Sequence, residues 1–167
     1  MNISSIKVNR SFAAVLLSLC LAGAAQAGTP KEGDAFPDLS KFGLEGALPD
    51  IQGKIVLVDF FASWCDPCKE SFPVMEELKQ KYGDKGFVIV AVNMDKKKED
   101  MEDFLKKHPV TFTIVRDASA KLAKEVQIPT MPSSFLLDKT GKVHAFHRGY
   151  KSDTKKKYVE QIESLLK

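Results

Sequence analysis

Two cysteines three positions apart, Cys65 and Cys68, are the residues whose type and spacing most directly indicate chemistry. A dithiol exchanges with a disulfide through a mixed disulfide, which requires one thiolate to attack and a second thiol to release the product. The pair follows an apolar run and begins a helical pattern, so unpaired amides and the helix dipole should lower the pKa of the first thiol. We therefore expect Cys65 to attack and Cys68 to resolve the mixed disulfide.

Other roles of a cysteine pair fit the neighbouring residues less well. A structural crosslink over so short a loop would stabilise the fold little. Attachment of c-type haem requires His directly after the second cysteine, and Lys69 stands there. A zinc site needs two more ligands, but of His108, His144 and His147 the last two lie at an odd separation on a predicted strand and should face opposite ways. We expect no metal site and no cofactor besides the cysteine pair.

The N-terminus has the pattern of a secretory signal. Lys7 and Arg10 form a basic start, an apolar run follows, and small residues at 25–27 suit cleavage. We expect residues 1–27 to be removed, leaving residues 28–167 as one domain in the periplasm, where disulfides persist. An uncleaved membrane anchor and a lipoprotein modified at Cys20 are the alternatives.

The overall charge of the chain is close to balanced. The net charge is +3, and without Lys7 and Arg10 the remainder carries 23 basic and 22 acidic side chains. Binding of phosphates needs a surplus of cations on one surface. We therefore expect no nucleic-acid partner.

Apolar periodicity and turn residues predict alternating strands and helices. Strands are expected at 55–58, 87–92, 111–115, 133–137 and 142–147, and helices at 67–82, within 95–108, at 119–126 and from about 152 onward, with short strands or a hairpin within 29–53. This order predicts an α/β fold with a mixed sheet covered on both sides.

From about Gly33 to its end the sequence resembles the thioredoxin superfamily, specifically the TlpA/ResA-like periplasmic branch. The residues that carry the resemblance surround the cysteines. Trp64 precedes the first cysteine, Pro67 precedes the second, Asp59 stands six positions before the first, and Pro73 stands five after the second. The resemblance implies a thioredoxin fold with a mixed central sheet flanked by helices, an N-terminal β extension and a helix–strand insertion between residues 92 and 116.

The resemblance also implies roles for individual residues. Pro132, rather than Pro129, is expected to form a cis peptide bond that faces the disulfide, so that the backbone beside Met131 offers an edge to a bound peptide. Asp59 is implied as the proton acceptor for Cys68, with a pKa raised by burial. Trp64, Met131 and the two residues between the cysteines, Asp66 and Pro67, are expected to form the substrate surface.

The direction of electron flow is expected to be reductive. Asp66 places a carboxylate beside Cys65, which should disfavour the thiolate and weaken the pair as an oxidant. The resemblance likewise implies a protein-disulfide reductase of the cytochrome c maturation type, fed by a membrane electron donor and acting on protein thiols as a monomer. A periplasmic oxidase or isomerase, and a protein that handles Cu(I) with its thiolates, are the alternatives.

Overall fold

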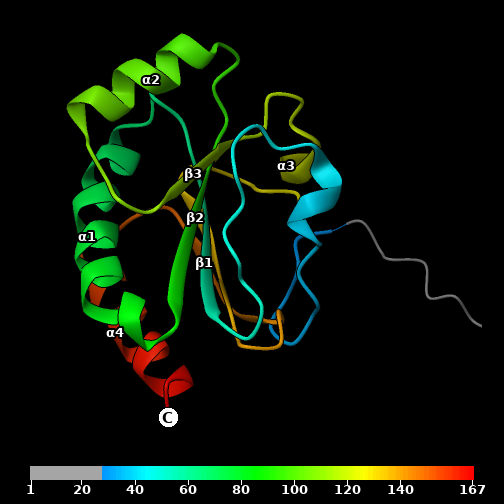
Figure 1. The fold of residues 1–167 in the computed structure, drawn as a ribbon, viewed down its shortest axis with the longest axis vertical. Helices are drawn as coiled ribbons and strands as arrows, with labels where there is room; N and C mark the ends of the chain where they lie inside the picture. Colours follow the sequence, from blue (N-terminus) through cyan, green and yellow to red (C-terminus); the bar gives the residue numbers. More distant parts are fainter. Residues whose placement is uncertain (1–27) are drawn as a thin grey trace, which may run out of the picture.

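The computed structural model describes residues 28–167. The predictions of a signal peptide, of its cleavage and of the fate of Cys20 lie outside the described residues. Within them, five strands form one sheet in the order β3-β2-β1-β4-β5. β1 pairs in parallel with β2, and β2 with β3, whereas β4 is antiparallel to both β1 and β5. The predicted mixed sheet is therefore confirmed (Figure 1).

From residue 55 onward, the predicted strands and helices all occur, with ends that differ by a few residues. The strands are β1 Ile55–Phe61, β2 Phe87–Asn93, β3 Thr113–Arg116, β4 Ser133–Leu137 and β5 Val143–Arg148; the helices are α1 Asp66–Tyr82, α2 Lys98–Lys107, α3 Lys121–Glu125 and α4 Thr154–Leu165, with 3-10 turns η1 Leu39–Phe42 and η2 Gly83–Lys85. The largest difference is at the end of β1, which continues three residues beyond its predicted end at 58 and so includes Asp59.

The β4–β5 hairpin shows how local sequence fixes the sheet. The Asp138 side chain accepts hydrogen bonds from the backbone amides of Thr140 and Lys142, at 2.8 and 3.0 Å. Gly141 has φ of 80°, a conformation that glycine adopts at little cost. The turn therefore returns the chain antiparallel to β4, as its composition predicts.

Helices and the N-terminal segment cover opposite faces of the sheet. α1, α2 and α4 lie on one face, and α3 with residues 28–54 lies on the other (Figure 1). We call the core under α1 and α4 the catalytic-face core, because both cysteines belong to it, and the core under α3 the opposite-face core. No helix of residues 28–167 has both the length and the apolar character needed to cross a bilayer.

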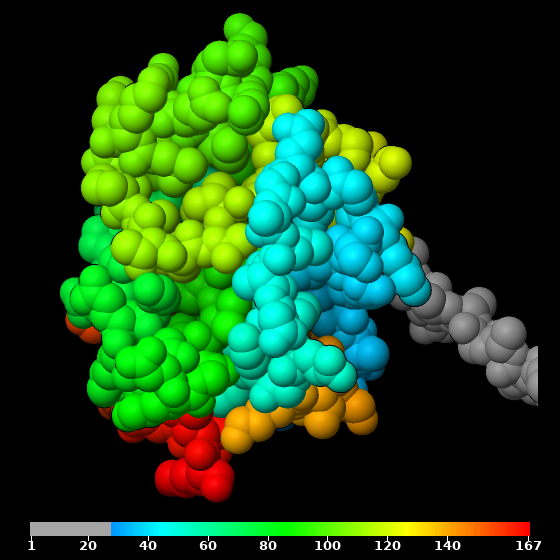
Figure 2. All heavy atoms as spheres, in the orientation of Figure 1, coloured from blue at the N-terminus to red at the C-terminus, as the bar shows by residue number. Residues whose placement is uncertain are grey.

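Residues 28–54 do not form the predicted short strands. They contain η1 and two isolated β-bridges, Ala35 with Lys142 and Glu45 with Arg116, so the N-terminal β extension is reduced to single contacts. Their apolar side chains, including Phe36 and Leu39, pack individually onto the opposite-face core instead of alternating along a strand. Figure 2 shows this segment, in blue and cyan, as a band along the molecule.

The helix–strand unit expected between residues 92 and 116 is present. It consists of α2 and β3, and β3 forms an edge of the sheet beside β2. Phe104 of α2 packs against Phe61 and Phe72, with ring centroids 5.5 and 4.9 Å apart. These aromatic contacts fix α2 over the catalytic-face core.

Candidate active site

Cys65 and Cys68 form a disulfide at the start of α1, with their Cα atoms 5.3 Å apart. Cys65 is the N-cap of the helix, and Cys68 lies in its first turn. Cys65 retains 4% of its surface, whereas Cys68 retains none. This difference in access fits the expectation that Cys65 meets the substrate and Cys68 acts from behind it.

The residues around the cysteines favour the beginning of a helix at this position. The amide of Cys65 donates to the carbonyl of Ala62, 3.1 Å away, in the tight turn that follows β1. Pro67 occupies one of the first two helical positions, where its missing N–H removes no intrahelical bond. The N-cap side chain makes no capping hydrogen bond, which leaves the positive end of the helix directed at the sulfur of Cys65.

A buried carboxylate, which the sequence analysis did not identify, holds the turn before the cysteines. Asp95, 3% exposed, accepts hydrogen bonds from the Ser63 amide at 3.0 Å and the Ser63 hydroxyl at 3.0 Å. It also accepts one from the Asn93 amide group at 2.7 Å. The polar residues Asn93 and Asp95 at the end of an apolar run indicate a need for hydrogen-bond partners, but the sequence does not identify those partners.

The same network extends to the N-terminal segment. The Arg116 guanidinium donates to the backbone carbonyls of Asp95 and Lys96, at 3.3 and 2.9 Å. The same guanidinium group forms a salt bridge with the Glu45 carboxylate, 2.6 Å away. The loop after β2, the edge strand and residues 28–54 are thereby joined behind the active-site turn.

Asp59 is buried, as expected, and lacks a hydrogen-bond partner among residues 28–167. Its side chain is 1% exposed, and neither carboxylate oxygen has a hydrogen-bond partner within residues 28–167. Burial raises the pKa of Asp59 well above its ordinary value. It shares the sheet face of Leu57 and Phe61, which belong to the catalytic-face core together with both cysteines.

The residues flanking Cys65 differ in what they can contribute. Trp64 is 67% exposed and presents a large apolar surface beside the attacking cysteine. Asp66 points outward, and a hydrogen bond from Lys69, 2.6 Å away, lowers its pKa. Because this carboxylate is exposed and paired, its field at Cys65 is screened. The structure therefore removes the basis for using Asp66 to predict the direction of electron flow.

The peptide bond between Met131 and Pro132 is cis, which confirms the choice of Pro132 over Pro129. The loop is held on both sides: the amide of Gly149 donates to the Pro132 carbonyl at 2.8 Å, and the Ser133 hydroxyl donates to the Thr130 carbonyl at 2.7 Å. The half-buried side chain of Met131 packs against the core that includes both cysteines. The cis-proline loop and the disulfide thus border the same core.

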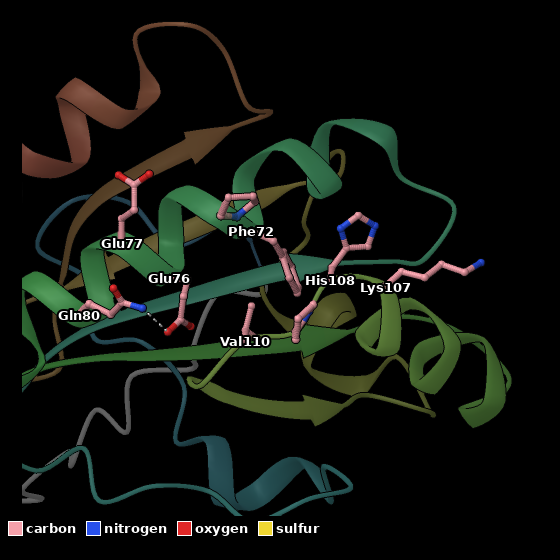
Figure 3. Close-up of a pocket in the computed structure, with 9 residues that line it drawn as sticks. Phe72, Glu76, Glu77, Gln80, Lys107, His108 and Val110 are labelled. Atoms are coloured by element: carbon pink, nitrogen blue, oxygen red, sulfur yellow. Dashed lines mark hydrogen bonds between the residues drawn. The ribbon is translucent and has the colours of Figure 1, made fainter.

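A groove on the outer side of α1 is separate from this site. It has a volume of about 400 Å³ and lies between α1 and the loop after α2 (Figure 3). Phe72, Pro73 and Val110 supply apolar walls, and Glu76 lines it while holding Thr111 through two hydrogen bonds of 2.7 Å. Neither cysteine lines this groove.

The described chain also lacks a candidate metal cluster. Residues 28–167 contain no group of three His, Cys, Asp or Glu side chains arranged to hold an ion. The groups at the site that can take part in chemistry include the disulfide and the buried carboxyl group of Asp59. A disulfide between closely spaced cysteines at a helix N-terminus, in this fold, is the arrangement of a thiol–disulfide oxidoreductase.

Comparison with known proteins gives the same class. Residues 31–162 match the redoxin family. The thiol–disulfide oxidoreductase ResA of Bacillus cereus is 34% identical over 175 aligned positions, which cover 97% of this chain and 98% of that protein. A Chlorobium tepidum protein described as a thiol:disulfide interchange protein DsbE is 39% identical, with a TM-score of 0.78 over 83% of this chain and 100% of that one. StoA of Bacillus subtilis is 30% identical, with a TM-score of 0.58 over 66% of this chain and 83% of that one.

The chain therefore belongs to the redoxin family, and within it to the ResA-like thiol–disulfide oxidoreductases of the thioredoxin superfamily.

Proposed function

We propose that the protein reduces disulfides of other proteins outside the cytoplasm, through the Cys65/Cys68 dithiol. The observation that carries this proposal is the disulfide itself, in which Cys65 is the more accessible cysteine at 4% exposed, Cys68 is fully buried, and the exposed Trp64 is adjacent to Cys65. The similarity to ResA and to the DsbE-like protein over most of their lengths supports it.

The proposed reaction begins with the reduced protein. The Cys65 thiolate attacks a substrate disulfide, forming a mixed disulfide and releasing one substrate sulfur as a thiolate, which takes a proton from water. The Cys68 thiol then gives its proton to Asp59 and attacks the Cys65 sulfur, which closes the Cys65–Cys68 disulfide and releases the second substrate thiolate, also protonated by water. Both electrons come from the dithiol, so no separate cofactor takes part. Trp64 and Met131, with Asp66, Pro67 and Pro132, line the surface that receives the substrate.

The cellular setting is part of the same proposal. The protein would act as a monomer in the periplasm after removal of residues 1–27, and a membrane donor would return two electrons to the disulfide. Apocytochrome c thiols, which must be reduced before haem attachment, are the substrate class that the resemblance to the TlpA/ResA-like branch favours.

A periplasmic oxidase or isomerase is the second candidate, and one observation favours it. Lys69 pairs with Asp66, so the carboxylate beside Cys65 does not oppose the thiolate as strongly as the sequence alone implied. A stabilised thiolate makes the reduced form more stable and the disulfide a stronger oxidant.

The reduction potential of the Cys65–Cys68 couple decides between the two. We would equilibrate residues 28–167 with glutathione or dithiothreitol buffers and follow Trp64 fluorescence. A potential near the thioredoxin value of about −270 mV is expected for a reductase. A potential near the DsbA value of about −120 mV would contradict reduction and establish an oxidant.

A further inference from the structure

Four neighbouring strands place a row of residues across the sheet at the level of Asp59. Ala91 of β2 and Ser134 of β4 are its direct partners on either side, and His147 of β5 is the partner of Ser134. Paired residues of adjacent strands project to the same side of a sheet. The four side chains therefore lie on the catalytic face, under α1 and α4.

A tyrosine of α4 closes over this row. The hydroxyl groups of Tyr158 and Ser134 are 2.6 Å apart, and both residues are almost fully buried, at 2% and 1% exposed. The His147 ring contacts the Tyr158 ring edge-on, with centroids 4.7 Å apart. Nε2 of His147 is in turn 2.8 Å from the side-chain oxygen of Gln161. The tyrosine is thus held in place from both sides.

Asp59 is the polar residue of this row whose side chain lacks a hydrogen-bond partner in the part of the chain that the structure describes. To accept a proton from Cys68 it must first be ionised, and an ionised carboxylate without hydrogen bonds in a dry core is strongly disfavoured. The methyl side chain of Ala91 cannot donate a hydrogen bond to the Asp59 carboxylate. Ser134, which pairs directly with Asp59 between β1 and β4, carries a hydroxyl group that can donate a hydrogen bond. In the structure this hydroxyl is hydrogen-bonded to Tyr158.

We propose that the Ser134–Tyr158 hydroxyl pair is a hydrogen-bond switch that stabilises the ionised state of Asp59. While Asp59 is protonated, the two hydroxyls bond each other, as the structure shows. When Asp59 ionises, the Ser134 hydroxyl turns to donate to the carboxylate, and Tyr158 donates to the Ser134 oxygen. Directly paired residues on antiparallel strands have Cβ atoms only about 5 Å apart, which places the Ser134 side chain beside that of Asp59. Ser134 and Tyr158 are positioning residues, and this role rests on the proposed function of Asp59 as the proton acceptor.

The titratable groups around the row are consistent with this assignment. Burial and the nearby Asp59 raise the pKa of Tyr158, so its hydroxyl remains a donor at physiological pH. Burial lowers the pKa of His147, which keeps its ring neutral. Tyr150, also near Tyr158, has a pKa raised by burial. The charged residues of α1 near this group are Glu70 and Glu77, which act on Tyr150, and burial is the cause of the raised Asp59 pKa.

The test is a titration of the Asp59 carboxyl carbon by ¹³C NMR in the oxidised protein. Because one hydrogen bond to a charged group corresponds to roughly one pKa unit or more, S134A should raise the Asp59 pKa by about one unit. Y158F should raise it by about half a unit, because it removes the second donor of the chain. Since the two hydroxyls act in series, the double variant should shift no further than S134A.

Tyr82→Phe is the matched control. Tyr82 is also buried, at 1% exposed, and its hydroxyl donates to Glu163 at 2.6 Å, but it lies at the far end of α1. Y82F should lower stability without moving the Asp59 titration. If Y158F and S134A leave the Asp59 titration where Y82F leaves it, the switch is disproved.

A kinetic readout links the switch to turnover. The rate at which Cys68 resolves a mixed disulfide should rise with pH through the Asp59 titration. In Y158F and in S134A, this rise should move to higher pH by the same amount as the NMR titration of that variant. A shifted NMR titration with an unshifted kinetic profile would disprove the functional role of the pair. The NMR result does not depend on the direction of electron flow, so it remains distinguishable from failure of the reductase proposal, which the reduction potential tests.

Discussion

The two faces of the central sheet use the same strands for different purposes. On the opposite face, alternate residues of β1 and β4 such as Val58, Phe60 and Phe135 form an apolar core with α3 and residues 28–54. On the catalytic face, the residues between them include Asp59 and Ser134, which lie among the apolar side chains around the disulfide. One face contributes mainly hydrophobic stabilisation, whereas the other gives up part of that stabilisation to hold polar groups on the face that also carries the disulfide.

This difference shows which face of the sheet accommodates a buried carboxyl group that has no hydrogen bond among the described residues. Neither oxygen of Asp59 has a partner among residues 28–167, whereas the buried Asp117 near α3 caps that helix by accepting from the amides of Lys121 and Ala123, at 2.9 and 3.0 Å. Buried polar groups are normally satisfied, and an exception calls for a functional explanation. The comparison thus separates a carboxylate with an evident structural role from one whose burial is consistent with the proposed role as proton acceptor.

Substitution of the cysteines should have the largest effect on the catalytic face. C65S should abolish reduction of insulin disulfides, because it removes the attacking thiolate. C68S should also abolish turnover but should accumulate a mixed disulfide between Cys65 and the substrate, detectable by mass spectrometry. Accumulation of the adduct in C65S instead would reverse the two roles.

Replacement of Asp59 with Asn should slow the resolving step by about 100-fold, the lower range for loss of a general base. Initial attack by Cys65 should change little, so stopped-flow measurement of each step separates the two effects. Equal slowing of both steps would show that Asp59 acts on the general structure of the site and not on the proton of Cys68.

The same substitution should change how stability depends on pH. Because burial raises the pKa of Asp59, the folded state binds more protons than the unfolded state between the ordinary aspartate pKa and the raised folded value. The free energy of unfolding should therefore fall as pH rises through this interval in the wild type. In D59N this fall should be absent, so urea denaturation should show the variant to be the more stable protein above the interval, by about 1–3 kcal/mol.

On the opposite face, a core substitution should change stability and leave redox chemistry intact. Leu122 of α3 is fully buried in the opposite-face core. L122A should lower the free energy of unfolding by about 2–5 kcal/mol, the usual range for such a cavity. The reduction potential of the folded variant should stay within about 10 mV of the wild type. A larger change in potential would show that the two faces are coupled.

The sequence was sufficient to predict the elements and the cysteine chemistry, because both depend on local patterns. Continuous apolar runs mark the buried strands, and a C-x-x-C pair before a helical pattern marks the site. The arrangement of residues 28–54 was not predictable in this way: scattered apolar residues can form strands or pack singly, and here they pack singly on a sheet assembled from distant residues.

The polar groups behind the site could not be predicted for a related reason. Tyr158 fits the apolar face of its helix, and Ser134 occupies an ordinary position in a strand. Their contact joins residues 24 positions apart and depends on how α4 crosses the sheet. Likewise, Asp95 reaches Ser63 across 32 positions. Such pairs become visible only when strand register and helix placement are known.

The smallest expected effect concerns Asp66, whose importance was inferred only from its position next to Cys65 in the sequence. Its carboxylate is exposed and paired with Lys69, so D66N should move the reduction potential of the pair by less than about 10 mV at physiological salt, because exposed charges are well screened. K69A, which leaves the carboxylate unpaired beside Cys65, should lower the potential more than D66N changes it, since an uncompensated negative charge disfavours the thiolate. Titration of both variants against glutathione gives the two changes in reduction potential, which can then be compared. A large shift in D66N would show that the charge next to Cys65 controls the potential, and it would restore Asp66 as an argument for the reductive direction.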